Sequence, residues 1–112
     1  MNPRARKYVW DALKALGEIR EFVRGKTLVD YRHDPLLRSA VERQIIIIGE
    51  ALTRLFREAP EATSRIKDIR KIIGLRNVLA HEYDKVENRT IWRIVNEELD
   101  EFAASLEKML KD

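Results

Sequence analysis

The sequence contains no cysteine, so disulfide bonds and a thiolate zinc site are excluded, which fits a reducing cytoplasm. Long hydrophobic runs are also missing. The longest is Ile45 to Ile48, whereas a membrane-spanning helix needs about 18 apolar residues. No apolar stretch follows the basic and polar residues 1–8, so we expect neither a signal peptide nor a membrane anchor. These absences predict a soluble, cytoplasmic protein.

The 112 residues are enough for one domain with a single modest core, which we place over residues 1–112. Charged residues make up 37% of the chain, but the formal net charge is only +3. Residues 65–76 carry five cations and one acid, whereas residues 93–112 carry three cations and six acids. The basic segment favours a polyanionic partner such as nucleic acid, and a solvated helix face is the alternative interpretation.

Apolar residues at spacings of three and four predict amphipathic helices. A glycine at the left-handed cap position, Gly25, is expected to end the first helix, and Asp34 with Pro35 to begin the second. Ala59 and Pro60 should end that helix. The predicted helices are about 3–24, 35–58, 65 to the region of 80, and 91–110, with connectors at 26–33 and 84–88. With no strand-like alternation, the predicted fold is all-α, an antiparallel up-down four-helix bundle.

The second predicted helix has more than one apolar face. Its main stripe includes Ile45 and Ile48, so Ile46 and Ile47 point elsewhere. In a chain this short they need either a second neighbouring helix or a partner subunit to cover them. We predict a homodimer, and a central helix buried on most sides within one bundle is the alternative. The third helix is expected to bury the stripe Ile66, Ile69 and Ile73.

The segment from Gly74 to Tyr83 gathers the residues best suited to chemistry. Arg76 can bind a phosphate through two N–H groups, and the His81 imidazole can take or give a proton near neutral pH. Asn77 lies four residues before His81 and could orient its ring. We expect Gly74 to permit a close backbone approach. This chemistry suits cleavage of an RNA phosphodiester without a metal or cofactor.

Each of these residues also has a structural interpretation. Arg76 could be a surface ion-pair partner, His81 could favour the C-terminal end of a helix dipole, and Tyr83 could simply pack its ring. On one helix, Arg76 and His81 are about 140° apart around the axis, so two chains meeting at a twofold axis could bring them together. His33 and His81 are the only histidines and lack a carboxylate cluster, which makes a metal site a poor interpretation.

Three segments together resemble the HepT-like family of HEPN-domain proteins: residues 47–51, residues 72–77 and His81-Glu82-Tyr83. The resemblance implies a toxin of a toxin-antitoxin module, a metal-independent endoribonuclease that acts as a homodimer with its cleft at the subunit interface. It implies that Arg76 and His81 form the catalytic pair and that Asn77 is their polar companion. It also implies an antitoxin, a minimal nucleotidyltransferase, that attaches AMP to Tyr83.

Two other functions remain open from the sequence. One is a non-catalytic helical binding module that partners a nucleotidyltransferase or binds a nucleotide, and the other is a small basic nucleic-acid binder. The role of Glu50 is also open. It could be structural, buried against Arg76 of the same or the other chain, or it could tune the site.

Overall fold

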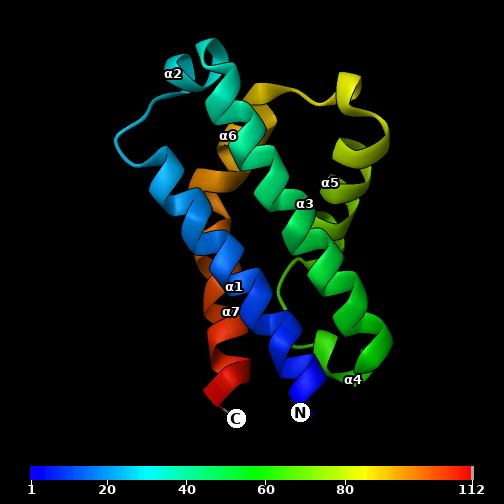
Figure 1. Cartoon of the computed structure of the whole chain (residues 1–112). Coiled ribbons are helices and arrows are strands. Elements are labelled where there is room, and N and C mark those ends of the chain that lie inside the picture. Colours follow the sequence, from blue (N-terminus) through cyan, green and yellow to red (C-terminus); the bar gives the residue numbers. More distant parts are fainter. Residues whose placement is uncertain (112) are drawn as a thin grey trace.

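A computed structural model describes residues 1–111, and this part of the chain is helical with no strand (Figure 1). None of the helices in these residues is both long and apolar enough to cross a membrane. The elements are α1 (Pro3–Val23), α2 (Leu28–His33), α3 (Pro35–Glu58), α4 (Pro60–Thr63), α5 (Ile69–His81), the 3-10 turn η1 (Tyr83–Lys85), α6 (Asn88–Glu97) and α7 (Leu99–Lys111).

The two longest helices begin where the sequence predicts, because side chains cap them. The Asn2 side-chain oxygen accepts a hydrogen bond from the Ala5 N–H at 2.8 Å, and Asp34 accepts one from the Leu37 N–H at 3.1 Å. In both helices a proline occupies the first turn, where it loses no hydrogen bond. The chain leaves α1 through Gly25, whose φ of 71° is the left-handed conformation expected of a cap.

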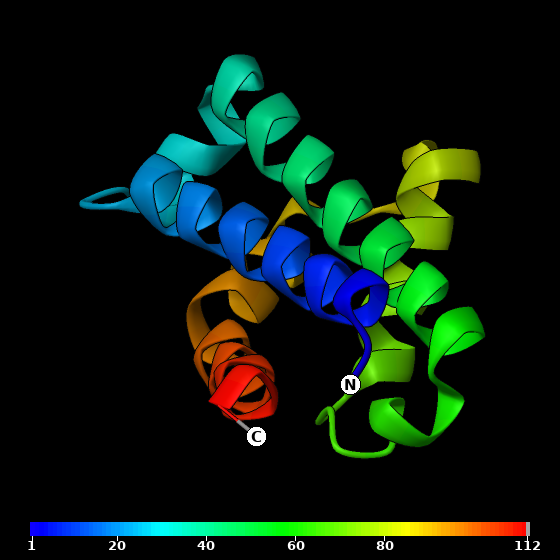
Figure 2. The same ribbon diagram turned by 60° about the horizontal axis from the view of Figure 1, so that its bottom comes forward.

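Helix α3 is the centre of the molecule. It lies beside α1 on one flank and α5 on the other, while α7 packs along α1 (Figure 2). Its predicted stripe is buried, and Ile46 and Ile47 are half-buried against the same core. The helices of one chain therefore already cover part of these two isoleucines, which do not by themselves require a partner subunit. The core side of the stripe consists of Leu37, Val41, Ile45, Ile48, Leu52 and Leu55.

The predicted connector at 26–33 is in fact helix α2. Thr27 and Asp30 form a reciprocal capping box: the Thr27 hydroxyl accepts the Asp30 N–H at 3.1 Å, and the Asp30 carboxylate accepts the Thr27 N–H at 2.9 Å. The helix carries Tyr31 into the core, fully buried, with its ring 5.3 Å from that of Trp92. The capping box stabilises a helix of six residues, which is too short for the spacing of apolar residues to predict it.

The third predicted helix begins later than expected. Pro60 ends α3 but starts α4, and Asp68 has a positive φ of 60°, so α5 begins at Ile69 rather than at Arg65. The predicted stripe also changes. Ile66 is buried outside the helix, whereas Ile69 and Ile73 are only half-buried. The side chains of α5 that enter the core are Ile72 and Leu79.

The fourth predicted helix is two helices, because the chain breaks between Glu97 and Leu99. The backbone at Glu98 departs from helical geometry, with φ −117° and ψ −23°. On the two sides of this bend α6 packs against α2 and α7 runs along α1, and the last turn of α7 lies at the same end of the molecule as the first turns of α1 (Figure 1).

Candidate active site

Arg76 lies on the side of α5 that faces α3, and its stem crosses α3 at Gly49. A Cβ atom at Gly49 would lie 2.2 Å from Cβ and 2.4 Å from Cγ of Arg76. Both of these carbon atoms are close to the α5 backbone, so no rotation of the arginine relieves such an overlap. The close helix approach is therefore at Gly49. The expectation that Gly74 serves this purpose is wrong, because a Cβ there would meet nothing within 4 Å.

The guanidinium of Arg76 is held from two directions. One terminal nitrogen donates to Asn77 Oδ1 at 3.0 Å, and the other donates to Glu50 Oε1 at 3.5 Å. The third nitrogen, Nε, is buried and has no hydrogen-bond partner within residues 1–111. The side chain is 25% exposed, and that of Glu50 is 42% exposed. Glu50 thus pairs with Arg76 of its own chain, one of the partners that the sequence left open, but the pair lies at the protein surface and Glu50 is not buried.

Asn77 supports Arg76 rather than His81 in this structure. Its side-chain oxygen accepts the hydrogen bond from Arg76, and within residues 1–111 the His81 imidazole makes no hydrogen bond. The four-residue spacing predicted a shared helix face correctly. It did not predict that the side-chain oxygen of Asn77 would instead accept a hydrogen bond from the adjacent Arg76.

His81 and Tyr83 lie beyond Arg76, where α5 ends. His81 is the last residue of α5 and is exposed, and the Glu82 N–H closes the helix on the Val78 carbonyl at 2.7 Å. Tyr83 begins η1 with 76% of its surface exposed. Arg76 and His81 stay on different faces of α5, about 140° apart and separated by about 7.5 Å along the axis.

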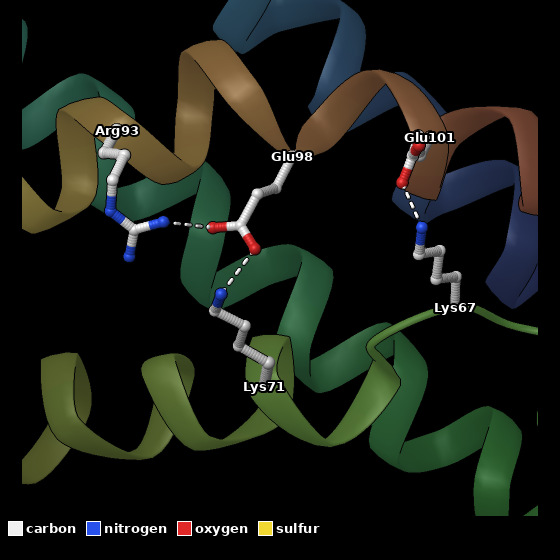
Figure 3. A network of polar contacts seen from close by, with 5 residues as sticks. All are labelled: Lys67, Lys71, Arg93, Glu98 and Glu101. Carbon is white, nitrogen blue, oxygen red and sulfur yellow. Dashed lines mark hydrogen bonds and ion pairs between the residues drawn. The ribbon is translucent and has the colours of Figure 1, made fainter.

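The basic segment that precedes Arg76 is partly neutralised by the fold. Figure 3 shows Glu98 between two cations: Lys71 reaches one of its oxygens, and Arg93 donates to the other at 3.0 Å. Lys67 pairs with Glu101 in the same way. The hydrogen bond from Lys71 is the main reason that the pKa of Glu98 lies below its usual value. The acidic C-terminal segment therefore cancels charge that the sequence alone placed in a basic patch.

A basic groove remains between α3 and α5, with a volume of about 440 Å³. Within residues 1–111, Arg54 and Arg57 make no hydrogen bond or ion pair through their side chains. Neither arginine is among the site residues predicted from the sequence, although they follow Glu50 by four and seven residues, a spacing that indicates a shared helix face. The residues that line this basic groove are Glu50, Thr53, Arg54, Arg57, Ile73, Arg76 and Asn77.

An apolar groove of about 550 Å³ adjoins the basic one. It lies among α3, α4 and α5 and includes Phe56, which is 54% exposed, together with the half-buried Ile69 and Ile73. Among residues 1–111 no group of three or more histidine, aspartate or glutamate side chains is placed to hold a metal ion.

The chain matches known proteins over almost its whole length. The family described as Ribonuclease HepT-like matches residues 12–109. A protein of Caldanaerobacter subterraneus subsp. tengcongensis named "Putative RNase TTE0752" is 36% identical over 107 residues, which are 96% of this chain and 91% of that protein. "Probable ribonuclease HepT" of Thermococcus cleftensis is 30% identical over 104 residues, 93% of this chain and 94% of that protein. No solved structure gave a significant match. The chain belongs to the HepT-like ribonuclease family.

Proposed function

We propose that this protein is a metal-independent endoribonuclease in which Arg76 and His81 form the catalytic pair. The family match over residues 12–109 carries the proposal. The position of Arg76 supports it, because a phosphate that enters the basic groove meets a guanidinium that Gly49, Glu50 and Asn77 already hold in place.

The reaction needs one proton acceptor, one proton donor and a phosphate clamp. The ribose 2′-oxygen attacks the adjacent phosphorus and the bond from phosphorus to the 5′-oxygen breaks, which leaves a cyclic phosphate and a 5′-hydroxyl. His81 takes the proton from the 2′-hydroxyl or gives one to the departing oxygen, and a water molecule makes the other of these two proton transfers. Arg76 binds the non-bridging oxygens and stabilises the charge that grows on them.

We further propose that the active unit is a homodimer of HEPN-like helical bundles. Arg76 and His81 diverge on α5, so one chain directs them to different sides, whereas a twofold axis can set Arg76 of one protomer beside His81 of its partner. The apolar groove with the exposed Phe56 adjoins the basic groove and offers a surface for such an interface.

The proposal extends to a toxin of the cytoplasm that a nucleotidyltransferase antitoxin neutralises. The exposed Tyr83 phenol would attack the α-phosphorus of ATP, losing its proton as pyrophosphate departs, and would become an adenylated tyrosine. Because Tyr83 follows His81 by two residues, the attached AMP adds bulk and negative charge beside the proposed site. RNA would then be repelled from it.

Cleavage of total RNA by the purified protein in excess chelator tests the activity, with wild type and His81→Ala side by side. Intact mass first establishes that Tyr83 is unmodified. We expect cleavage by wild type alone and equal helix content in both proteins. Cleavage by both variants would remove His81 from the mechanism.

The alternative is a non-catalytic module that binds a nucleotidyltransferase or a nucleotide and uses Arg76 only to hold an anion. The divergence of Arg76 and His81 within one chain favours this alternative if the protein is monomeric. It predicts no cleavage by the unmodified protein and partner binding that survives His81→Ala. Light scattering on the same sample decides whether a dimer is present.

A further inference from the structure

We propose that Arg54 and Arg57 form a second anion-binding subsite, which holds a backbone phosphate of single-stranded RNA next to the phosphate bound by Arg76. The subsite rests on the proposed function for its substrate. It names two residues outside the Arg76-to-Tyr83 segment as determinants of RNA binding.

The geometry of α3 places these arginines together. Arg54 and Arg57 are three residues apart, so they are neighbours on one face, about 4.5 Å apart along the helix axis. Both line the basic groove, which Arg76 lines from α5, and Arg57 stands at the border with the apolar groove. Three guanidinium groups thus border one groove of about 440 Å³.

The charge of Arg54 and Arg57 is available to a ligand. Both side chains are exposed, and within the described part of the chain neither has an acidic partner. Two other arginines of this molecule differ in this respect, since Arg20 pairs with Asp100 at 3.0 Å and Arg93 pairs with Glu98. Unpaired arginines are the more effective anion binders because no intramolecular ion pair has to break first.

The groove retains positive charge after its internal contacts are made. Glu50 is its one acidic lining residue, and it faces Arg76. Thr53 donates its hydroxyl proton to the Gly49 carbonyl at 2.8 Å, so the threonine is not a donor to a ligand. Donors for a bound anion at this end of the groove therefore come from Arg54 and Arg57.

The chemistry of the groove selects a phosphate. A planar guanidinium presents paired N–H groups that match two oxygens of one phosphate. Arg76 borders the same groove. When the scissile phosphate of an RNA strand binds Arg76, the neighbouring phosphate of that strand therefore lies beside Arg54 and Arg57. Such contacts follow the backbone and carry no base preference.

The test measures binding separately from cleavage. Arg54→Gln, Arg57→Gln and the double variant are made in a His81→Ala background, so that the RNA stays intact. Fluorescence anisotropy with a labelled single-stranded RNA of mixed sequence gives Kd across a salt series. The matched control is Arg32→Gln, which removes an exposed arginine without an ion-pair partner in residues 1–111, on α2 at the other end of α3.

We expect the double variant to bind RNA at least about tenfold more weakly than its parent, and each single variant to show an intermediate loss. The slope of log K against log salt should fall by about 0.7 for each arginine removed. Arg32→Gln should leave both quantities unchanged. With His81 intact, the same substitutions should raise KM for RNA cleavage and leave kcat close to wild type.

Unchanged affinity and salt slope in variants with wild-type circular dichroism would overturn the subsite, whatever other molecule uses the groove. An equal loss with Arg32→Gln would also overturn it, because binding would then depend on total charge. The proposed ribonuclease activity is tested independently of the subsite. If RNA binding depends on Arg54 and Arg57 but wild type cleaves no RNA, the subsite stands and the proposed activity is overturned. Should the double variant not fold, the single variants still decide the matter.

Discussion

Cations lie along both flanks of α5, but the two sets differ in what surrounds them. On the flank facing α6 and α7, Lys67 and Lys71 pair with the acids of the C-terminal segment (Figure 3). On the flank facing α3, Arg76 shares the basic groove with Arg54 and Arg57 against one glutamate. A count of charges along the sequence finds the first cluster more easily than the second. Only the second retains charge for a ligand.

The comparison separates two uses of a basic residue. A lysine can pair with an acid from a distant segment of the chain. Such a pair links two helices and contributes to the fold. An arginine at a groove whose N–H groups are not all used in internal hydrogen bonds is suited to bind an anion. Substitutions on the two flanks should therefore affect different measurements.

The largest effect is expected at Arg76, on the flank of α5 that faces α3. Arg76→Ala should lower kcat/KM for RNA cleavage by at least about a hundredfold, because the developing phosphate charge loses its guanidinium. Arg76→Lys should recover only part of this loss, since an ammonium lacks the paired N–H geometry. Cleavage assays on variants with unchanged circular dichroism check the prediction. Full activity of Arg76→Ala would contradict the proposed catalytic role.

Gly49→Ala should damage both activity and stability. Its methyl group would overlap the first two side-chain carbons of Arg76, so α3 and α5 must separate. We expect a loss of about 1–3 kcal/mol in the free energy of unfolding and a fall in cleavage rate of about tenfold to a hundredfold. Urea denaturation and single-turnover cleavage measure the two effects.

Gly74→Ala is the matched control for Gly49→Ala. A Cβ at Gly74 would meet nothing within 4 Å, and this glycine lies inside α5. The alanine should stabilise the protein by up to about 1 kcal/mol through helix propensity alone. Equal effects of the two substitutions would show that the contact between Gly49 and Arg76 does not govern the site.

Glu98→Gln should lower the free energy of unfolding without changing RNA cleavage, because Glu98 lies on the flank of α5 where acids neutralise the lysines (the neutralised flank). The substitution leaves Lys71 and Arg93 unpaired, and we expect a loss of about 1 kcal/mol at neutral pH. The folded pKa of Glu98 is lowered from 4.5, so its carboxylate stabilises the fold above that pH. The difference from wild type should shrink as pH falls below this value.

Thermal unfolding of wild type and Glu98→Gln between neutral and acidic pH gives this comparison. Glu97→Gln is the control, because its exposed side chain has no ion pair within residues 1–111. A difference that grew as pH decreased would have the wrong sign for a carboxylate with a lowered pKa.

The smallest effect is expected at Lys67, on the same flank. Lys67 and Glu101 are both more than half exposed, so solvent and salt screen their attraction. Lys67→Gln should leave the unfolding midpoint and the RNA cleavage rate at wild-type values. A loss of cleavage comparable with that of the Arg54 and Arg57 variants would mean that the neutralised flank also binds RNA.

Local signals made much of the fold predictable. Caps and prolines act within a few residues, and the predicted start of α1 and the predicted bounds of α3 are confirmed. The start of α5 was missed because it depends on the left-handed conformation of Asp68, which is unusual for a residue other than glycine. The break at Glu98 was missed because the apolar spacing continues through it.

Part of the candidate site could also be predicted from the sequence, and part could not. The order of Arg76, Asn77, His81 and Tyr83 in the sequence indicated the candidate segment. Together with residues 47–51 and 72–75 it indicated the family, which the match over residues 12–109 confirms. The catalytic and modification roles of these residues stay predictions. Gly49, Arg54 and Arg57 become part of the site only because α3 crosses α5 at Gly49, a contact between residues that are distant in the sequence.

The helical class, the limits of α1 and α3 and the family can be predicted from the sequence, because capping and side-chain spacing are local and the three motif segments are each short. Which cations are neutralised, which glycine must lack a side chain and which groove lies beside Arg76 follow from the tertiary structure. Electrostatic pairing and steric overlap depend on distance in space, and segments far apart in the chain set those distances.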